Sequence, residues 1–257
     1  MTIDTTKPSI GRIYDYVLGG HHNFEADRIA AQKILKVFPS YPTWARLNRW
    51  FVQMVAEQWA GSGHNHILDL GSGMPTQGHF HSAAPHAKVL YTDLDPVTVA
   101  YAHEVIGDNP LVSYIQADLR DPAEIFDAAN QLFLGERRAA IGFIGLAYFL
   151  DDESLAQLAR MLYDWAAPGS VMALSYAYMQ IDTEQARERL EHFKRNSAQL
   201  FMRDEAQMRA LMAPWQVREI KPLASWLGVE HLVQEADREG LDAEMYGVML
   251  VHEEVAS

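Results

Sequence analysis

Three acidic residues accompany three short apolar runs in the middle of the chain. Asp69 lies within the run 67–70, Asp93 ends the run 89–93, and Asp118 follows the run 112–116. Apolar runs of this length, each followed by a helical pattern, are typical of strands in a parallel sheet. Ligands bind such sheets just beyond the carboxyl ends of the strands. We therefore expect the three carboxylates to meet at one binding site.

The first run leads into a glycine turn. Its residues Gly71, Ser72 and Gly73, with Thr76 and Gln77 shortly after, are expected to bind a cofactor, because glycine lets the backbone approach a ligand without a Cβ in between. Thr76 stands where the third glycine of the dinucleotide fingerprint would fall. The turn therefore departs from that fingerprint.

The positions of the acids favour one cofactor over another. A carboxylate at Asp93 can accept both hydroxyls of a ribose, which suits either NAD or S-adenosylmethionine. Asp69 favours S-adenosylmethionine, because an acid inside a buried strand is costly unless paired, and the amine of the methionine moiety would pair with it. Asp118 is placed to accept from the adenine amino group, and Leu94 and Leu119 to flank the ring.

Several of these segments resemble a known family. Residues 68–73, 91–96 and 116–118 resemble the first three cofactor-binding motifs of class I S-adenosylmethionine-dependent methyltransferases, although Met74-Pro75 replace the usual residue followed by glycine. Residues 9–24 and 74–78 are similar to an uncharacterised family of such proteins that is common in actinobacteria. The resemblance implies an α/β fold with a Rossmann-like, seven-stranded methyltransferase sheet, S-adenosyl-L-methionine as cofactor, and no settled substrate.

Helices dominate the chain before the first strand. Apolar residues at steps of three and four predict helices over 10–18, 24–38 and 43–59, with Ser9 capping the first. We therefore predict a helical N-terminal extension or lid over residues 1–60 and a class I S-adenosylmethionine-binding methyltransferase domain over 61–257.

Strands and crossover helices alternate after residue 61. The predicted strands cover 66–70, 89–93, 112–116, 139–144, 170–176, 217–222 and 245–251, and the predicted crossover helices begin near Gln77, Val97, Pro122 and Asp152. A long helical stretch from Thr183 lies where related folds insert substrate-binding elements. Its charged side is expected to face solvent, and its apolar side to contact the N-terminal helices or to cap the acceptor pocket.

The N-terminal segment carries further candidate ligands of the cofactor. Arg12 could bind the methionine carboxylate in bidentate fashion, and Tyr14 and Asn23 could line the methyl side; packing or solvated roles for these residues remain the alternative. The adjacent His21 and His22 point to different faces of any regular structure, so we expect them to be structural and predict no metal site.

The catalytic residues cannot be assigned from the sequence. Tyr148, Tyr176 and Tyr178 follow or end predicted strands on the acceptor side and could shape an aromatic pocket, but residues of this kind are more often core. Methyl transfer from a sulfonium needs an aligned acceptor and, for a poor nucleophile, a base. We therefore leave the general base unassigned.

The composition of the chain restricts the kinds of molecule that it can bind. The net charge of −13 repels polyanions, so we expect no nucleic-acid partner. The absence of cysteine excludes disulfides and thiolate chemistry and fits a reducing compartment. No secretory signal or membrane-spanning stretch is evident in the sequence, which indicates a cytoplasmic protein without a membrane partner.

These observations predict an S-adenosylmethionine-dependent methyltransferase that acts on a small-molecule acceptor by in-line displacement. The alternatives are a non-catalytic sensor of S-adenosylmethionine or S-adenosylhomocysteine, a non-methylating enzyme that uses the same cofactor, and an NAD-dependent oxidoreductase. The oligomeric state stays open. An apolar face on the N-terminal helices would suit a homodimer as well as a lid.

Overall fold

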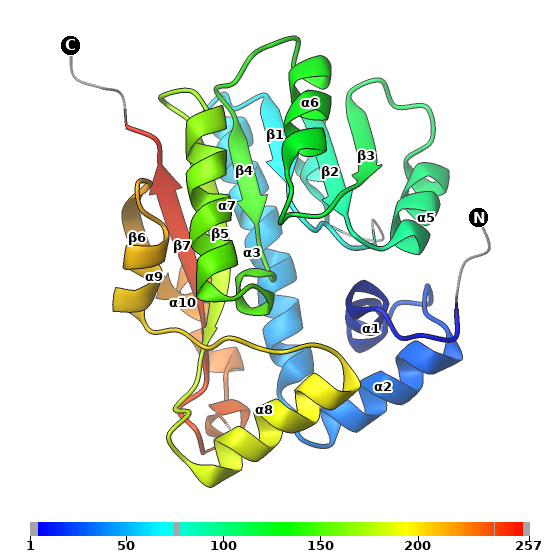
Figure 1. Cartoon of the computed structure of the whole chain (residues 1–257), viewed down its shortest axis with the longest axis vertical. Coiled ribbons are helices and arrows are strands. Elements are labelled where there is room, and N and C mark those ends of the chain that lie inside the picture. The colour runs from blue at the N-terminus through cyan, green and yellow to red at the C-terminus, as the bar shows by residue number, and fades with distance from the viewer. Residues whose placement is uncertain (1–4, 75–77, 239, 254–257) are drawn as a thin grey trace.

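A seven-stranded mixed sheet forms the centre of the molecule. The computed structural model describes residues 5–74, 78–238 and 240–253, and within them the strands run in the order β3-β2-β1-β4-β5-β7-β6 (Figure 1). β7 is antiparallel to β5 and β6, and the remaining pairs are parallel. The predicted Rossmann-like methyltransferase sheet is confirmed. Its strands are β1 (His66–Asp69), β2 (Lys88–Asp93), β3 (Val112–Gln116), β4 (Ala140–Phe143), β5 (Val171–Tyr178), β6 (Gln216–Pro222) and β7 (Glu244–Val251).

The central strands are buried on both sides. In β4 every side chain is buried, and in β1 and β2 only residues at the ends are not. Parallel strands covered by helices on both faces need such continuous apolar sequence. This is why they could be located as unbroken apolar runs, with ends that differ from the predicted ones by a residue or two.

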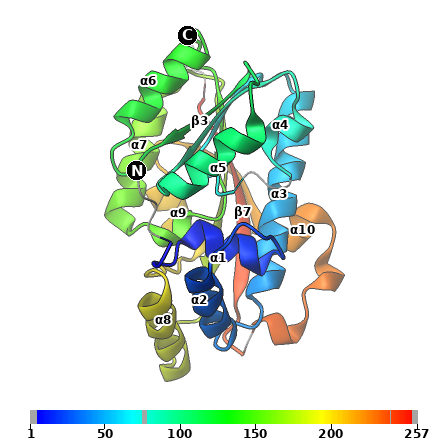
Figure 2. The ribbon, with the colours of Figure 1, turned by 90° about the vertical axis from the view of Figure 1, so that its right-hand side faces the viewer.

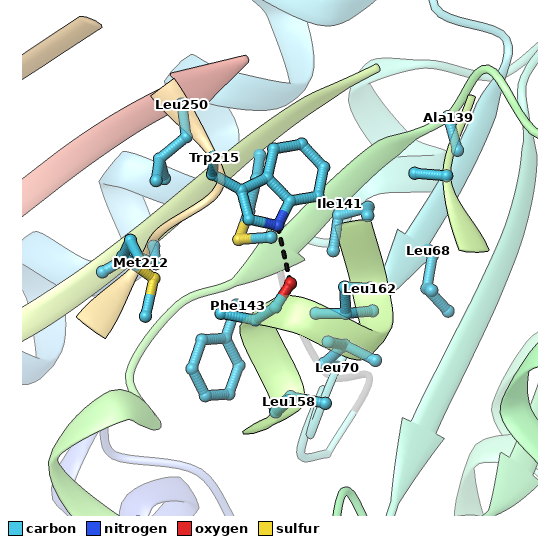
Figure 3. Close-up of a cluster of buried hydrophobic side chains, with 14 of the residues drawn as sticks. Leu68, Leu70, Ala139, Ile141, Phe143, Leu158, Leu162, Met212, Trp215 and Leu250 are labelled. Carbon is cyan, nitrogen blue, oxygen red and sulfur yellow. Dashed lines mark hydrogen bonds between the residues drawn. The ribbon is translucent and has the colours of Figure 1, made fainter. Parts of the chain in front are cut away.

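Helices cover both faces of the sheet. One face packs against α6 (Ala123–Leu132), α7 (Asp152–Trp165) and α9 (Glu205–Leu211). The other packs against α3 (Tyr41–Gly61), α4 (Phe80–Ala83), α5 (Pro96–Ile106) and α10 (Leu223–Leu227). In the first of these cores the indole N–H of Trp215 donates to the carbonyl oxygen of Ala159 at 2.9 Å (Figure 3). This bond satisfies the one polar atom of a large core side chain.

A third group of helices lies beyond the carboxyl ends of the parallel strands. It consists of α1 (Ile10–Val17), α2 (Glu25–Leu35) and α8 (Glu184–Asn196). α8 is far from α1 and α2 in sequence but packs beside α2 (Figures 1 and 2). Ile13, Ala31, Ile34 and Phe193 are buried together between them. The insertion after β5 and the N-terminal helices therefore form one wall over the edge where a ligand would bind. Three short 3-10 turns complete the described elements: η1 (Ala147–Phe149), η2 (Glu230–Leu232) and η3 (Glu235–Arg238).

Two local predictions differ from the structure. The helix expected near Gln77 would begin outside the described residues, and the described part of that crossover holds the four-residue α4 instead. Ser9 does precede α1, but its side chain makes no capping hydrogen bond to the helix; its backbone N–H donates to Asp27 Oδ1 at 2.9 Å.

Among the described helices, none is long and apolar enough to cross a bilayer.

Candidate functional site

A cleft of 630 Å³ opens at the carboxyl ends of β1, β2, β3 and β4, beneath α1 and α3. Its size lies within the range of small-molecule sites, about 300–1,000 Å³. Nine of the residues predicted to bind a cofactor line it: Tyr14, Asp69, Gly71, Ser72, Gly73, Asp93, Leu94, Asp118 and Leu119. Arg12 and Asn23 lie elsewhere, as described below, and Thr76 and Gln77 lie outside the described residues.

The glycine turn is fastened to β2 by backbone hydrogen bonds. Gly73 N–H donates to Asp93 Oδ2 at 3.0 Å, and Ser72 N–H donates to the Thr92 carbonyl oxygen at 2.8 Å. Gly71 has φ +60°, and a Cβ there would lie 2.1 Å from Leu146 Cδ1. The turn therefore needs glycine both for its backbone conformation and for close contact with the loop after β4.

Asp93 sits at the end of β2, where a ribose is expected. Its carboxylate accepts from Gly73 N–H and, at 2.8 Å, from Asp95 N–H, and the lone pairs that remain can accept from two hydroxyls. Burial raises the pKa of Asp93 to about 6, against the lowering effect of these two hydrogen bonds. The carboxyl group is thus ionised at pH 8 and ready to accept.

Next to Asp93, the cleft wall is apolar and has an acidic residue at its edge. Leu94 is 58 % exposed and lines the cleft together with Leu119. Asp118 accepts from Arg120 Nε at 2.9 Å, and this bond is the main cause of the lowered pKa of Asp118. Leu94 and Leu119 give this part of the cleft wall an apolar surface, and Asp118 adds a hydrogen-bond acceptor beside it. A flat heterocycle with an amino group matches this arrangement.

Two opposite charges mark the other end of the cleft. Asp69 is 6 % exposed, and burial raises its pKa to about 7, while a hydrogen bond from Ser72 and the charge of Arg49 act in the opposite direction. Arg49 comes from the middle of α3, and its guanidinium lies 5.9 Å from the centre of the Tyr14 ring. Within the described chain it makes no hydrogen bond or ion pair. Arg49 is therefore a cation on the cleft wall that is available to an anionic ligand group.

Arg12, in contrast, is fully engaged inside the protein. Its Nε donates to Asp27 Oδ2 at 2.8 Å, one terminal nitrogen donates to Asp95 Oδ2 at 2.6 Å, and the other donates to the Lys7 carbonyl oxygen at 2.8 Å. It is 2 % exposed and does not line the cleft. The contact with a methionine carboxylate expected from the sequence is therefore not what this geometry provides. Arg12 instead ties α1 and α2 to the N-terminus of α5, next to Asp93.

Asn23 has a structural position as well. Its side-chain amide donates to Asp15 Oδ2 and to the Gly20 carbonyl oxygen, both at 3.0 Å. Asp15 is buried and also accepts from His22 N–H at 2.8 Å. These contacts fold the loop between α1 and α2, so Asn23 shapes this loop rather than lining the cleft.

The aromatic candidates separate into two groups. Tyr14 lines the cleft and donates its hydroxyl to the Ala45 carbonyl oxygen at 2.7 Å, and burial raises its pKa to about 12. Tyr148 lines the cleft too, and Tyr178 lines a smaller cavity next to it. Tyr176 lies in the core on the side of α7 and stacks on Tyr246, with 5.2 Å between ring centres. It is therefore a packing residue.

The histidines near the glycine turn also make structural contacts. His79 Nε2 is 2.9 Å from the Met74 carbonyl oxygen, and His81 Nδ1 is 2.8 Å from the Tyr91 hydroxyl. Burial lowers the pKa of both imidazoles. Across the described ranges no three His, Asp or Glu side chains are grouped as metal ligands.

Comparison with known proteins identifies the family. A family model described as S-adenosyl methyltransferase matches residues 1–243. The chain belongs to this family. It is an S-adenosylmethionine-dependent methyltransferase, and no curated protein matches its sequence.

Two solved structures resemble the methyltransferase over almost its whole length. One is a protein from Thermobifida fusca provisionally described as a methyltransferase, with 25 % identity, a TM-score of 0.85, and coverage of 98 % of this chain and 97 % of that one. The other is a DUF574 family protein from Streptomyces avermitilis, with 25 % identity, a TM-score of 0.84, and coverage of 97 % and 99 %. Magnesium protoporphyrin IX methyltransferase from Synechocystis, solved with S-adenosylhomocysteine, shares the fold at 11 % identity, a TM-score of 0.56 and coverage of 94 % and 93 %.

The cleft of the methyltransferase fits S-adenosylmethionine at both ends. The amino-acid end of the cofactor carries an amine and a carboxylate, and Asp69 and Arg49 offer one charge of each opposite sign. The nucleoside end needs a carboxylate and an apolar slot, which Asp93 and Leu94 offer.

Sequence reasoning had missed Arg49. No local signal marks it, because a polar residue between the core positions Leu47 and Phe51 is what the polar side of any amphipathic helix shows.

Proposed function

We propose that this methyltransferase transfers the methyl group of S-adenosylmethionine to a small-molecule acceptor by in-line displacement. The cofactor supplies a methyl group that its sulfonium has already activated. What remains for the protein is to hold an acceptor atom in line at about 3–3.5 Å and to exclude water. The observation that supports this proposal most is the presence of a carboxyl group, Asp69, and a cation, Arg49, in the same cleft as Asp93.

The walls of the cleft would position the cofactor and keep it dry. Asp69 would accept from the amine, Arg49 would donate to the carboxylate, and Asp93 would accept from the ribose hydroxyls. Arg12 contacts none of these groups. It would act as a positioning residue, because its bonds to Asp27 and Asp95 hold α1 and α2 against the strand end that carries Asp93.

The acceptor side favours a reaction without a protein base. Tyr14, Tyr41 and Tyr148 line the cleft, and burial raises the pKa of each hydroxyl. They therefore stay protonated at neutral pH and cannot remove a proton from the acceptor. We propose an acceptor whose nucleophilic atom can attack the methyl group without first being deprotonated by the protein.

The net charge of −13 supports a small acceptor over a nucleic acid. Incubation with S-adenosylmethionine carrying a labelled methyl group, in a cell extract, tests this directly. We expect the label in the fraction of small molecules. Label recovered in nucleic acid or protein would contradict the proposal.

The cofactor site itself is tested by titration calorimetry. Asp93→Ala should weaken S-adenosylmethionine binding by about 10- to 100-fold, the range expected for losing charge-assisted hydrogen bonds. Asp164→Ala, which removes an exposed carboxylate on α7, is the matched control and should bind like the wild type. Equal affinity of Asp93→Ala and the wild type would show that the ribose is held elsewhere.

A further inference from the structure

A second, smaller cavity adjoins the cofactor cleft. It measures 90 Å³ and shares three wall residues with the cleft: Tyr41, Tyr148 and Phe149. The rest of its wall comes from α3, the end of β5, α8 and the segments around residues 200 and 244. We call it the side chamber. Its other lining residues are Phe38, Ser40, Trp44, Ala177, Tyr178, Met179, Phe193, Leu200, Met202, Ala243, Glu244 and Met245.

The aromatic side chains of the side chamber pack against one another. The ring centre of Phe193 lies 5.9 Å from that of Phe38 and 6.2 Å from that of Tyr41, both in edge-to-face arrangement. Tyr148 and Phe149 meet in the same manner at 4.8 Å. Rings held in this way lose little freedom when a ligand arrives, so the chamber is preformed for an apolar group.

Charge in the side chamber is confined to one acid. Of the described residues that line it, Glu244 is the only carboxylate, and Arg and Lys are absent from the lining. The Glu244 side chain is 6 % exposed; Oε2 pairs with Arg238 at 2.8 Å and Oε1 accepts from Met245 N–H at 3.0 Å. An anionic group in the chamber would be desolvated without a cation on the wall to pair with it, because Arg238 already pairs with Glu244, and the cost in free energy would be high.

We infer that the side chamber holds an uncharged, apolar ring or branched alkyl end of the methyl acceptor. This inference rests on the proposed function and specifies its substrate class. A volume of 90 Å³ admits only part of a molecule, so the remainder of the acceptor extends past Tyr41, Tyr148 and Phe149 into the cleft. The acceptor atom therefore reaches the methyl group from the side of these three residues, while carboxylates and phosphates are excluded from the chamber.

Probe binding tests the chemistry of the chamber. The protein is saturated with S-adenosylhomocysteine, and binding of p-cresol and of benzoate is measured by saturation-transfer NMR. We expect p-cresol to bind at least tenfold more tightly than benzoate. Benzoate binding as tight as p-cresol, or no binding of p-cresol, would overturn the inference.

Filling the chamber tests its location. Ala177→Leu adds bulk from β5 and Leu200→Trp adds bulk from the segment after α8. Each should weaken p-cresol binding at least tenfold while the dissociation constant for S-adenosylmethionine stays within twofold. Ala60→Leu, at an exposed position of α3, is the matched control and should change neither. Undiminished p-cresol binding in a filled variant that still binds the cofactor would overturn the inference. If the wild type does not bind S-adenosylmethionine at all, the proposed cofactor site is refuted instead.

Discussion

Replacing Asp69 by asparagine should stabilise the free protein and weaken its binding of the cofactor. The side chain is buried in β1, and its pKa rises from 3.8 to about 7, mainly because burial disfavours the charged form. Holding the group ionised at pH 8 therefore costs the folded protein about 4 kcal/mol. An amide of the same shape removes most of this cost.

The effect on stability depends on pH with a definite sign. Folded Asp69 binds its proton more tightly than the unfolded chain does, so the wild type loses stability as pH rises from about 4 to 7. The Asp69→Asn variant has no proton to lose at this position. Its free energy of unfolding should therefore exceed that of the wild type by about 4 kcal/mol at pH 8, by about 1.5 kcal/mol at pH 5, and by close to zero below pH 4.

Urea denaturation of the cofactor-free protein measures this difference, with tryptophan fluorescence as the signal. The wild type, Asp69→Asn and the control Asp164→Asn are compared at pH 8 and pH 5. The control should match the wild type at both values, because its carboxylate is exposed. A variant less stable than the wild type at pH 8, or an advantage equal at both pH values, would refute the reasoning.

Three further predictions concern the same cleft. The amine of the cofactor favours the ionised form of Asp69, so S-adenosylmethionine binding should release a proton, and the affinity should weaken as pH falls from 8 to 6. Calorimetry in buffers of different ionisation enthalpy measures the proton release. An affinity that does not depend on pH would contradict this prediction. Arg49→Met should reduce the affinity about 10- to 100-fold and leave the unfolding free energy within about 0.5 kcal/mol of the wild type. Arg46→Met, at an exposed position of the same helix, is the control and should change neither the affinity nor the unfolding free energy. Arg12→Met should lower the unfolding free energy by about 3–5 kcal/mol, because the fully buried Asp27 would lose its cationic partner and keep only backbone N–H donors. A loss below about 1 kcal/mol in urea denaturation would show that Arg12 does not hold these helices in place.

The sheet and its ligand-binding edge were predictable because local sequence determines them. Buried parallel strands must be continuously apolar, and the turn after β1 must contain glycine, so both are visible in short windows of sequence. The carboxylates of Asp69, Asp93 and Asp118 follow the ends of neighbouring strands, and the topology alone brings them to one cleft. Their individual contacts with the cofactor stay predictions, as does a domain boundary at residue 60.

The roles of the two arginines were decided only by the tertiary structure. Arg12 and Arg49 both lie on amphipathic helices, and their sequence neighbours do not reveal which of them meets buried acids. The pairing of Arg12 with Asp95 joins residues far apart in the chain, and it depends on how α1 crosses α5. The side chamber has the same origin, because α3, β5, α8 and β7 each contribute part of its wall. Sequence patterns specify which face of an element is buried, whereas the partner across that face is set by packing over the whole chain.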